Sequence, residues 1–217
     1  MVTSTSVVLG SASPARLRVL RGAGLDPRVI VSDVDEDAIL AGLGSAPPAE
    51  VVVRLAEAKA EAVVAAVLDG DDPADGTSSR DLVVLTCDSM LLFDGTLTGK
   101  PHTPDVAREQ WRRMRGRSAE LLTGHAVSHI VDGHVSRRAT AAASTTIRFA
   151  DVSDAAIDAY VATREPLSVA GAFTLDGLGG WFVEGIDGDP SSVLGIGLPT
   201  VRRLLGDVGV DVTTLWT

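Results

Sequence analysis

The residues best suited to chemistry in this sequence are a carboxylate and a few cations that lie far apart along the chain. Asp88 closely follows the apolar run Leu82–Thr86, which is typical of a strand buried on both faces. Ligands of open α/β sheets gather at the carboxyl ends of strands, so a carboxylate there is a natural metal ligand or general base. A turn or helix-capping aspartate is the competing interpretation, and the residues alone leave both open.

Lys59 is the second candidate, because it interrupts the apolar stripe of a predicted helix. Residues 48–68 are rich in Ala and Val, and Lys59 stands four residues after Leu55 and four before Val63. An inward-facing lysine is costly unless it meets an anion or reaches water. The alternative is a lysine that reaches solvent at the rim of the core. Glutamates already occupy the polar face of this helix, which favours a role for Lys59 in a cleft.

The beginning of the chain predicts a strand, a tight turn and a helix. Val7–Leu9 is the strand, and Ser13 and Pro14 suit the cap and first position of a helix that ends near residue 21. The free N–H groups at such a helix start can bind phosphate, and Arg16 could add charge. An ordinary capped helix with surface arginines is the simpler interpretation of Ser11–Arg16.

A third cation, Lys100, lies in a segment that superficially resembles a Walker A loop. Three residues rather than four separate Gly95 from Gly99, and Pro101 follows the lysine where the pattern requires Ser or Thr. We therefore reject a P-loop, and with it the main signal for a kinase. Lys100 is retained as a candidate point charge for phosphate.

Composition narrows the class of protein. The 217 residues include 45% hydrophobic and 4% aromatic side chains, so we expect a globular core built on Val, Leu, Ile and Ala. The net charge of −10 disfavours a nucleic acid polymer as partner, although a cleft can be locally basic. A single cysteine excludes an internal disulfide. Neither a signal peptide nor a membrane span is indicated, so we expect a soluble, cytoplasmic protein without a membrane partner.

The expected elements alternate between strands and helices, which predicts an α/β fold with a mixed sheet. Asp132-Gly133 indicates a hairpin between two long strands. Surface loops are expected at 41–48 and, without any chemistry, at 69–81. The expected strands are 7–9, 29–31, 82–86, 121–131, 135–149 and 181–183, and the expected helices are 14–21, 48–68, 105–114, 153–162 and 199–205.

Taken in order, these segments resemble the motifs of the Maf proteins, whose fold is related to that of the inosine triphosphate pyrophosphatases. Each motif is weak alone, but their order and spacing over about residues 7–205 are specific. The resemblance implies one domain spanning residues 1–217, with a central twisted mixed sheet flanked by helices and with two lobes that form a cleft. The matching segments are Gly10–Arg16, Asp33–Glu36, Leu55–Ala60, Asp88-Ser89, Gly99–Pro101, Tyr160–Pro166, Ala170–Phe173 and Gly188–Leu198.

The resemblance also implies an activity, the hydrolysis of a nucleoside triphosphate, canonical or modified, to the monophosphate and pyrophosphate. A divalent cation, Mg²⁺ or Mn²⁺, is implied, together with a housecleaning role and a homodimer. Asp88 matches the general base and a metal ligand, and Glu36 matches a metal-related acidic position. The positions that match substrate-binding residues are Ser11, Ser13, Arg16, Lys59 and Lys100.

Three positions depart from the family pattern and bear on base choice. Ala15 replaces an arginine, Ser89 replaces a threonine and Asp176 replaces a glutamine. The preferred base and sugar therefore stay open, while the phosphate chemistry is retained. A regulator of cell division that binds nucleotide without turnover is the alternative function, and the presence of every candidate catalytic position argues against it.

Overall fold

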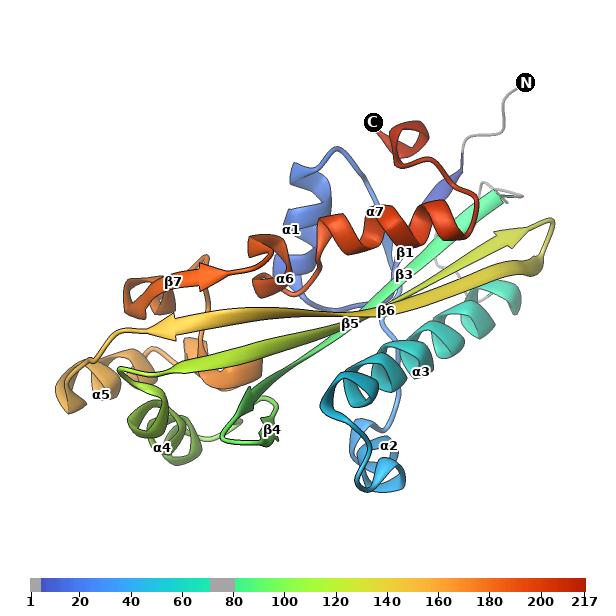
Figure 1. The fold of residues 1–217 in the computed structure, drawn as a ribbon. Helices are drawn as coiled ribbons and strands as arrows, with labels where there is room; N and C mark the ends of the chain where they lie inside the picture. Colours follow the sequence, from blue (N-terminus) through green and yellow to red (C-terminus); the bar gives the residue numbers. More distant parts are fainter. Residues whose placement is uncertain (1–4, 71–80) are drawn as a thin grey trace. The chain divides into compact units, whose positions relative to one another are not determined.

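The computed structural model describes residues 5–70 and 81–217, and these residues form an α/β fold with a mixed sheet (Figure 1). Within these ranges the strand order is β2-β1-β3-β5-β6-β7, with β4 paired to β3. β1 runs parallel to β2 and β3, whereas β4 is antiparallel to β3 and β7 to β6. The predicted fold class is therefore confirmed. In the described part of the chain, no helix is both long and apolar enough to cross a membrane.

The strands are β1 (Ser6–Leu9), β2 (Arg28–Val29), β3 (Asp81–Phe93), β4 (Thr96–Thr98), β5 (Ser118–Val131), β6 (His134–Phe149) and β7 (Val183–Asp187). The α-helices are α1 (Pro14–Gly22), α2 (Glu36–Leu43), α3 (Pro48–Leu68), α4 (Pro104–Met114), α5 (Asp154–Ala162), α6 (Pro190–Val193) and α7 (Leu198–Asp207). Short 3₁₀ helices are η1 (Glu165–Ser168), η2 (Ala170–Ala172), η3 (Leu178–Phe182) and η4 (Val212–Leu215).

The chain divides into two compact units, and the long strands β3, β5 and β6 contribute to both. Unit 1 is drawn from Met1–Asp88, Gly124–Ala143 and Leu198–Thr217. Unit 2 is drawn from Ser89–Thr123 and Ser144–Gly197. Each unit thus combines segments that are distant in the sequence, so its core could not be inferred from any single stretch of the chain.

In unit 1, one face of the sheet packs against α3 through aliphatic side chains, as expected from the composition. Leu82 and Val84 of β3 belong to one buried cluster with Val63 and Val64 of α3. Because side chains alternate along a strand, the next two residues on this face are Thr86 and Asp88. The apolar face of β3 therefore leads directly to a carboxylate.

Asp88 lies inside β3 and not, as predicted, just beyond the end of a strand. β3 continues to Phe93 because the buried apolar run resumes at Met90 after two polar residues. The Asp94-Gly95 turn, with positive φ at both residues, then returns the chain into β4. The strand predicted at 82–86 was therefore too short.

The loop predicted at 41–48 is confirmed only for residues 44–47, because α2 continues to Leu43 and α3 begins at Pro48. Asp35 caps this helix, its Oδ1 accepting a hydrogen bond from the Ala38 N–H at 2.9 Å. Ile39, Leu40 and Leu43 are half-buried, so the helix has an apolar side despite its acidic first turn. Asp35, Glu36 and Asp37 therefore begin a helix and do not form a solvated loop.

Other boundaries also differ from the prediction, and β2 covers only Arg28–Val29 where a strand at 29–31 was expected. Residues 181–182 lie in the 3₁₀ helix η3, so the strand predicted at 181–183 is wrong and the real strand, β7, begins at Val183. A Cβ on Gly179 would lie 2.5 Å from the Tyr160 hydroxyl, so the close packing of η3 requires glycine there. Of the loop predicted at 69–81, residues 69–70 form the turn after α3 and Asp81 begins β3, while residues 71–80 lie outside the described residues.

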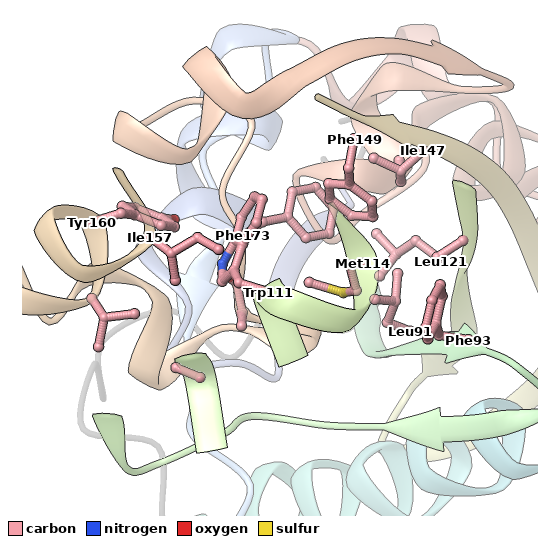
Figure 2. Packing of buried hydrophobic residues seen from close by; sticks show 14 of the residues in the cluster. Leu91, Phe93, Trp111, Met114, Leu121, Ile147, Phe149, Ile157, Tyr160 and Phe173 are labelled. Carbon is pink, nitrogen blue, oxygen red and sulfur yellow. The ribbon is translucent and has the colours of Figure 1, made fainter. Parts of the chain in front are cut away.

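Unit 2 has an aromatic core, contrary to the expectation of an entirely aliphatic interior. Trp111 of α4 is fully buried, and its ring meets Phe149 and Tyr160 edge to face at centroid distances of 5.5 and 5.7 Å (Figure 2). It meets Phe182 in the same way at 5.6 Å. Its Nε1–H donates to the Ala172 carbonyl at 2.7 Å, so its polar atom is satisfied. The chain's few aromatic residues are mostly concentrated here.

Glu165 anchors the glycine-rich segment of unit 2. Its carboxylate accepts hydrogen bonds from the Tyr160 and Thr174 hydroxyls at 3.1 and 2.5 Å and from the backbone N–H groups of Leu178 and Gly179 at 3.1 Å. Partial burial would raise the pKa of Glu165, but these hydrogen bonds, led by that of Thr174, outweigh it and lower the pKa. The ionised carboxylate thus holds the segment around it.

Glu165→Gln should destabilise the protein by about 1–3 kcal/mol near pH 7, because an amide nitrogen would face N–H donors. Because the pKa of Glu165 is lower in the folded protein, its ionised carboxylate stabilises the fold above the ordinary pKa of 4.5. This stabilisation is lost as the pH falls through the pKa of the folded state. The difference in melting temperature between wild type and variant should therefore shrink below about pH 4.5. Glu184→Gln, at an exposed position of β7, serves as control. A difference that does not change with pH would contradict this role of Glu165.

β5 passes so close to α3 that only glycine fits at one position. A Cβ added to Gly124 would lie 2.0 Å from the Val52 carbonyl oxygen, and backbone atoms cannot move aside easily. Gly124→Ala should lower the free energy of unfolding by about 3 kcal/mol, measured by urea denaturation. Gly206→Ala is the matched control, since a Cβ there meets nothing within 4 Å and the position is helical. The control should be neutral or stabilising by up to about 1 kcal/mol.

Candidate active site

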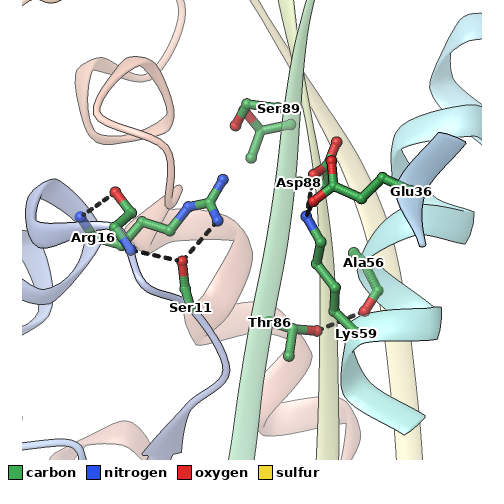
Figure 3. Close-up of polar contacts among 10 residues, drawn as sticks. Ser11, Arg16, Glu36, Ala56, Lys59, Thr86, Asp88 and Ser89 are labelled. Carbon is green, nitrogen blue, oxygen red and sulfur yellow. Dashed lines mark hydrogen bonds and ion pairs between the residues drawn. The ribbon is translucent and has the colours of Figure 1, made fainter. Parts of the chain in front are cut away.

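Unit 1 holds a lysine ammonium between two carboxylates. Lys59 Nζ lies 2.5 Å from Asp88 Oδ1 and 2.8 Å from Glu36 Oε1 (Figure 3). The Lys59 and Asp88 side chains are each 10% exposed, whereas that of Glu36 is 42% exposed. The inward orientation predicted for Lys59 is confirmed, and its partner anions are two of the candidate site residues.

Hydrogen bonding between α3 and β3 positions this cluster. The Thr86 hydroxyl donates to the Ala56 carbonyl at 2.7 Å, which fixes the helix beside the strand two residues before Asp88. Gly10, at the end of β1, allows this packing, because a Cβ there would lie 2.5 Å from Thr86 Cγ2. The Lys59 side chain leans toward the N-terminus of its helix, as helical side chains do, and so reaches Asp88.

Burial dominates the electrostatics of Asp88. Desolvation raises the pKa of this carboxyl, and the charge of Glu36 adds to the rise. The ammonium of Lys59, by charge and hydrogen bond, and the guanidinium of Arg16 act in the opposite direction but do not cancel it. A carboxylate with a raised pKa is a stronger proton acceptor than an ordinary aspartate, which suits a general base.

The neighbouring Cys87 is not a nucleophile. It is buried, and desolvation raises the pKa of its thiol to about 12. Since the thiolate is the reactive form, this thiol is inert near neutral pH. The chemistry of this part of β3 therefore rests on Asp88.

Two serines accept hydrogen bonds in the turn at the start of α1, and of these only the helix cap at Ser13 was predicted. Ser13 caps the helix, its hydroxyl accepting from the Arg16 N–H at 3.4 Å. The Ser11 hydroxyl accepts from the Ser13 N–H at 3.2 Å and from Arg16 Nη1 at 3.0 Å. Figure 3 shows Arg16 and Lys59 approaching β3 from opposite sides. Ala15, beside Arg16, is half-buried and adds no charge.

The remaining predicted residues belong to unit 2. Lys100 is exposed just beyond β4, and backbone hydrogen bonds secure its segment on both sides. The Gly171 N–H donates to the Gly99 carbonyl at 3.1 Å, and the His102 N–H donates to the Leu167 carbonyl at 3.0 Å. Two motifs some seventy residues apart are thus joined by hydrogen bonds that hold the backbone around Lys100.

A chain of hydroxyl groups holds Ser89. Its Oγ lies 3.0 Å from Thr123 Oγ1, which donates to the Ser192 carbonyl at 3.3 Å. Because Thr123 has one hydroxyl proton, Ser89 is the donor in their shared hydrogen bond. Asp189 in turn accepts hydrogen bonds from Ser191 and Ser192 at the start of α6. Asp176, the third departure from the family pattern, is exposed in a bend.

Sequence reasoning missed Thr86, Thr123 and Ser192 as positioning residues. Thr86 had a readable signal, since it is a hydroxyl within an apolar strand and shares the face of Asp88 by alternation. Thr123 and Ser192 had none, because they meet across a separation of 69 residues. Residues that act only through distant hydrogen bonds leave no local pattern.

The carboxylates of Asp88 and Glu36 are oxygen ligands of the kind that divalent cations such as Mg²⁺ prefer. Among residues 5–70 and 81–217, no three His, Cys, Asp or Glu side chains gather as a metal-binding group. Asp88 and Glu36 nevertheless place two carboxylates around one point, which Lys59 Nζ occupies. Mg²⁺ typically binds one or two carboxylates and completes its shell with water and substrate phosphates. The pair therefore suits such a shared site better than a cage made by protein alone.

Comparison with known proteins identifies the family. Residues 6–208 match the family described as Maf-like protein. The chain belongs to the Maf family. Relatives named nucleoside triphosphate pyrophosphatase include those of Nocardia farcinica, 60% identical over 99% of this chain and 98% of the relative, and of Saccharopolyspora erythraea, 58% identical over 96% of each. A Rhodococcus opacus protein of the same name is 60% identical over 98% of this chain and 96% of its own. The resemblance seen in the motifs is thus confirmed.

Within this Maf protein, Thr86→Val should lower the free energy of unfolding by about 1 kcal/mol, because the hydroxyl that joins β3 to α3 is lost without a change of shape. Urea unfolding curves measure the effect. Thr96→Val is the control on exposed β4 and should stay within about 0.5 kcal/mol of wild type. Equal stabilities of the two variants would show that the Thr86–Ala56 hydrogen bond contributes nothing.

Proposed function

We propose that this protein hydrolyses nucleoside triphosphates to the monophosphate and pyrophosphate. The observation that carries the proposal is the buried Lys59–Asp88 pair with Glu36 beside it, in a chain that aligns over nearly its full length with relatives named for this activity. Phosphoryl transfer requires mainly positioning and neutralisation of phosphate charge. A cluster of opposite charges inside an acidic protein suits that task.

Asp88 is the proposed general base. Its raised pKa favours proton uptake, and β3 holds its carboxylate in one position. It would accept a proton from the water that attacks the α phosphorus. Arg16, Lys59 and Lys100 would bind phosphate oxygens, with the Ser11 and Ser13 turn adding polar groups to the substrate-binding set.

A divalent cation, Mg²⁺ or Mn²⁺, is part of the proposal. When bound by Asp88 and Glu36 it would neutralise phosphate charge as a Lewis acid. Support comes from the two carboxylates that converge on one point, a donor set suited to a cation shared with phosphate. The protein's own contribution is to hold these carboxylates, by strand β3 and by the capped start of α2.

Base selection is proposed to involve Ala15, Ser89 and Asp176. The hydroxyl of Ser89 donates its proton to Thr123 and so would offer a positioned acceptor, whereas the exposed Asp176 would offer a negative charge. A canonical or a modified base fits this proposal, and a substrate panel distinguishes them. A cytoplasmic location and a homodimer stay predictions.

The direct test incubates the protein with each canonical and several modified triphosphates in the presence of MgCl₂ or MnCl₂. The expected products are monophosphate and pyrophosphate, with no reaction after chelation by EDTA. Nucleotide binding without any pyrophosphate would overturn the proposal in favour of a non-catalytic regulator. Release of a nucleoside diphosphate would instead indicate phosphoryl transfer of the kinase type.

Asp88→Asn should reduce kcat by about 10²–10⁴-fold, since general-base catalysis typically contributes that much. Circular dichroism should show an unchanged fold, because the substitution preserves shape. Asp94→Asn, just beyond the end of the same strand, removes an exposed charge and should retain activity. Full turnover by Asp88→Asn would exclude this residue as the base.

A further inference from the structure

Lys59 occupies the point that a metal ion bound by both carboxylates would need. Its Nζ lies within 2.8 Å of one oxygen of Asp88 and one of Glu36. Mg²⁺ contacts its oxygen ligands at about 2.0–2.1 Å, so a cation bridging these oxygens would take the place of the ammonium. Two positive charges cannot share that point, because their repulsion in a buried site is large. Ammonium and metal are therefore mutually exclusive there.

We propose that Lys59 closes the metal position until a triphosphate draws its ammonium away, so that the divalent cation binds together with the nucleotide and not before it. The inference rests on the proposed function and specifies the order in which that site fills. Lys59 thus has two successive anionic partners. The carboxylates hold it in the nucleotide-free protein, and a phosphate holds it in the complex.

The lengths and positions of the three side chains suit this exchange. Asp88 is a short side chain on β3, and Lys59 is a long side chain on α3. Glu36, the more exposed partner, stands in the first turn of α2. The ammonium can therefore swing by rotation of its own side chain, while the backbone that presents the carboxylates stays in place.

Charge balance explains why a nucleotide would be needed. The charges of the two carboxylates are largely balanced by the Lys59 ammonium and the nearby Arg16 guanidinium, so a cation arriving alone gains little and must displace a hydrogen-bonded partner. A triphosphate offers the ammonium new oxygen partners and the cation additional ligands. Removal of the ammonium alone should have the same effect on the metal position as its transfer to phosphate.

The experiment measures binding of MnCl₂ alone by the loss of the free Mn²⁺ electron paramagnetic resonance signal. Lys59→Met retains the apolar stem and removes the charge, and should bind Mn²⁺ about tenfold or more tightly than wild type. Arg54→Met is the matched control, since it removes an exposed positive charge from the same helix, and should bind as wild type does. Lys59→Arg keeps the charge and should also bind Mn²⁺ weakly.

A second measurement uses the wild-type protein and needs no variant. The α,β-methylene analogues of UTP and GTP should each be added with MnCl₂, correcting for the Mn²⁺ that the analogue binds without protein. At least one analogue should increase Mn²⁺ affinity about tenfold or more. The double variant Lys59→Met with Asp88→Asn should lose the higher Mn²⁺ affinity of Lys59→Met. That loss would show that the additional Mn²⁺ binds at the Asp88 carboxylate.

Several results would overturn the inference. It fails if Lys59→Met binds Mn²⁺ no better than wild type, or if the gain in affinity survives in the double variant. It also fails if wild type binds Mn²⁺ equally with and without either analogue. Absence of Mn²⁺ binding in every sample would do the same. The proposed function fails separately, if the wild-type protein releases no pyrophosphate from any triphosphate, so the two failures are distinguishable.

Discussion

The rest of unit 1 is arranged around one buried ammonium that lies against two carboxylates. Removing such charges from water is costly, and a buried ion pair is poor evidence for stability by itself. Here α3 and β3 place Lys59 and Asp88 in contact, and the Thr86–Ala56 hydrogen bond holds these two elements together. Carboxyl groups whose pKa is raised by burial are common at functional sites, which supports the proposed role of Asp88 as general base.

Small residues and hydroxyl groups supply the precision of this arrangement. Gly10 and Gly124 allow backbones to approach α3 and β3 more closely than any side chain would permit. In unit 2, Gly171 secures the backbone of Gly99, and Thr123 fixes the hydroxyl of Ser89. Such contacts bury little apolar surface. They position the site residues more than they stabilise the fold. Stability comes from the aliphatic core of unit 1 and the aromatic core of unit 2.

The strongly acidic composition and a phosphate-binding role are compatible because charge acts locally. The net charge of −10 is spread over the whole chain, whereas Arg16 and Lys59 approach β3 from its two sides. Low local dielectric strengthens the field of a partly buried cation, and salt screens it less than surface charge. An overall negative protein can thus still bind a small polyanion while repelling nucleic acid polymers.

The sequence by itself determined the helices and strands with strong local signals, and most of the candidate residues. The capped start of α1, the whole of α3 and the β5–β6 hairpin were predicted because their periodicity, caps and turn residues act within a few positions. Lys59 was identified as inward-facing from helical spacing alone. The family, too, was readable in the order of short motifs.

Tertiary structure decided the features that depend on distant partners. α2 forms because its half-buried apolar side has α3 to pack against. The pairing of Lys59 with Asp88 and Glu36, and the hydroxyl chain from Ser89 to Ser192, join residues that no local pattern connects. Hydrogen bonds and ion pairs are short-range in space but not in sequence, so only the folded chain could reveal which groups they unite.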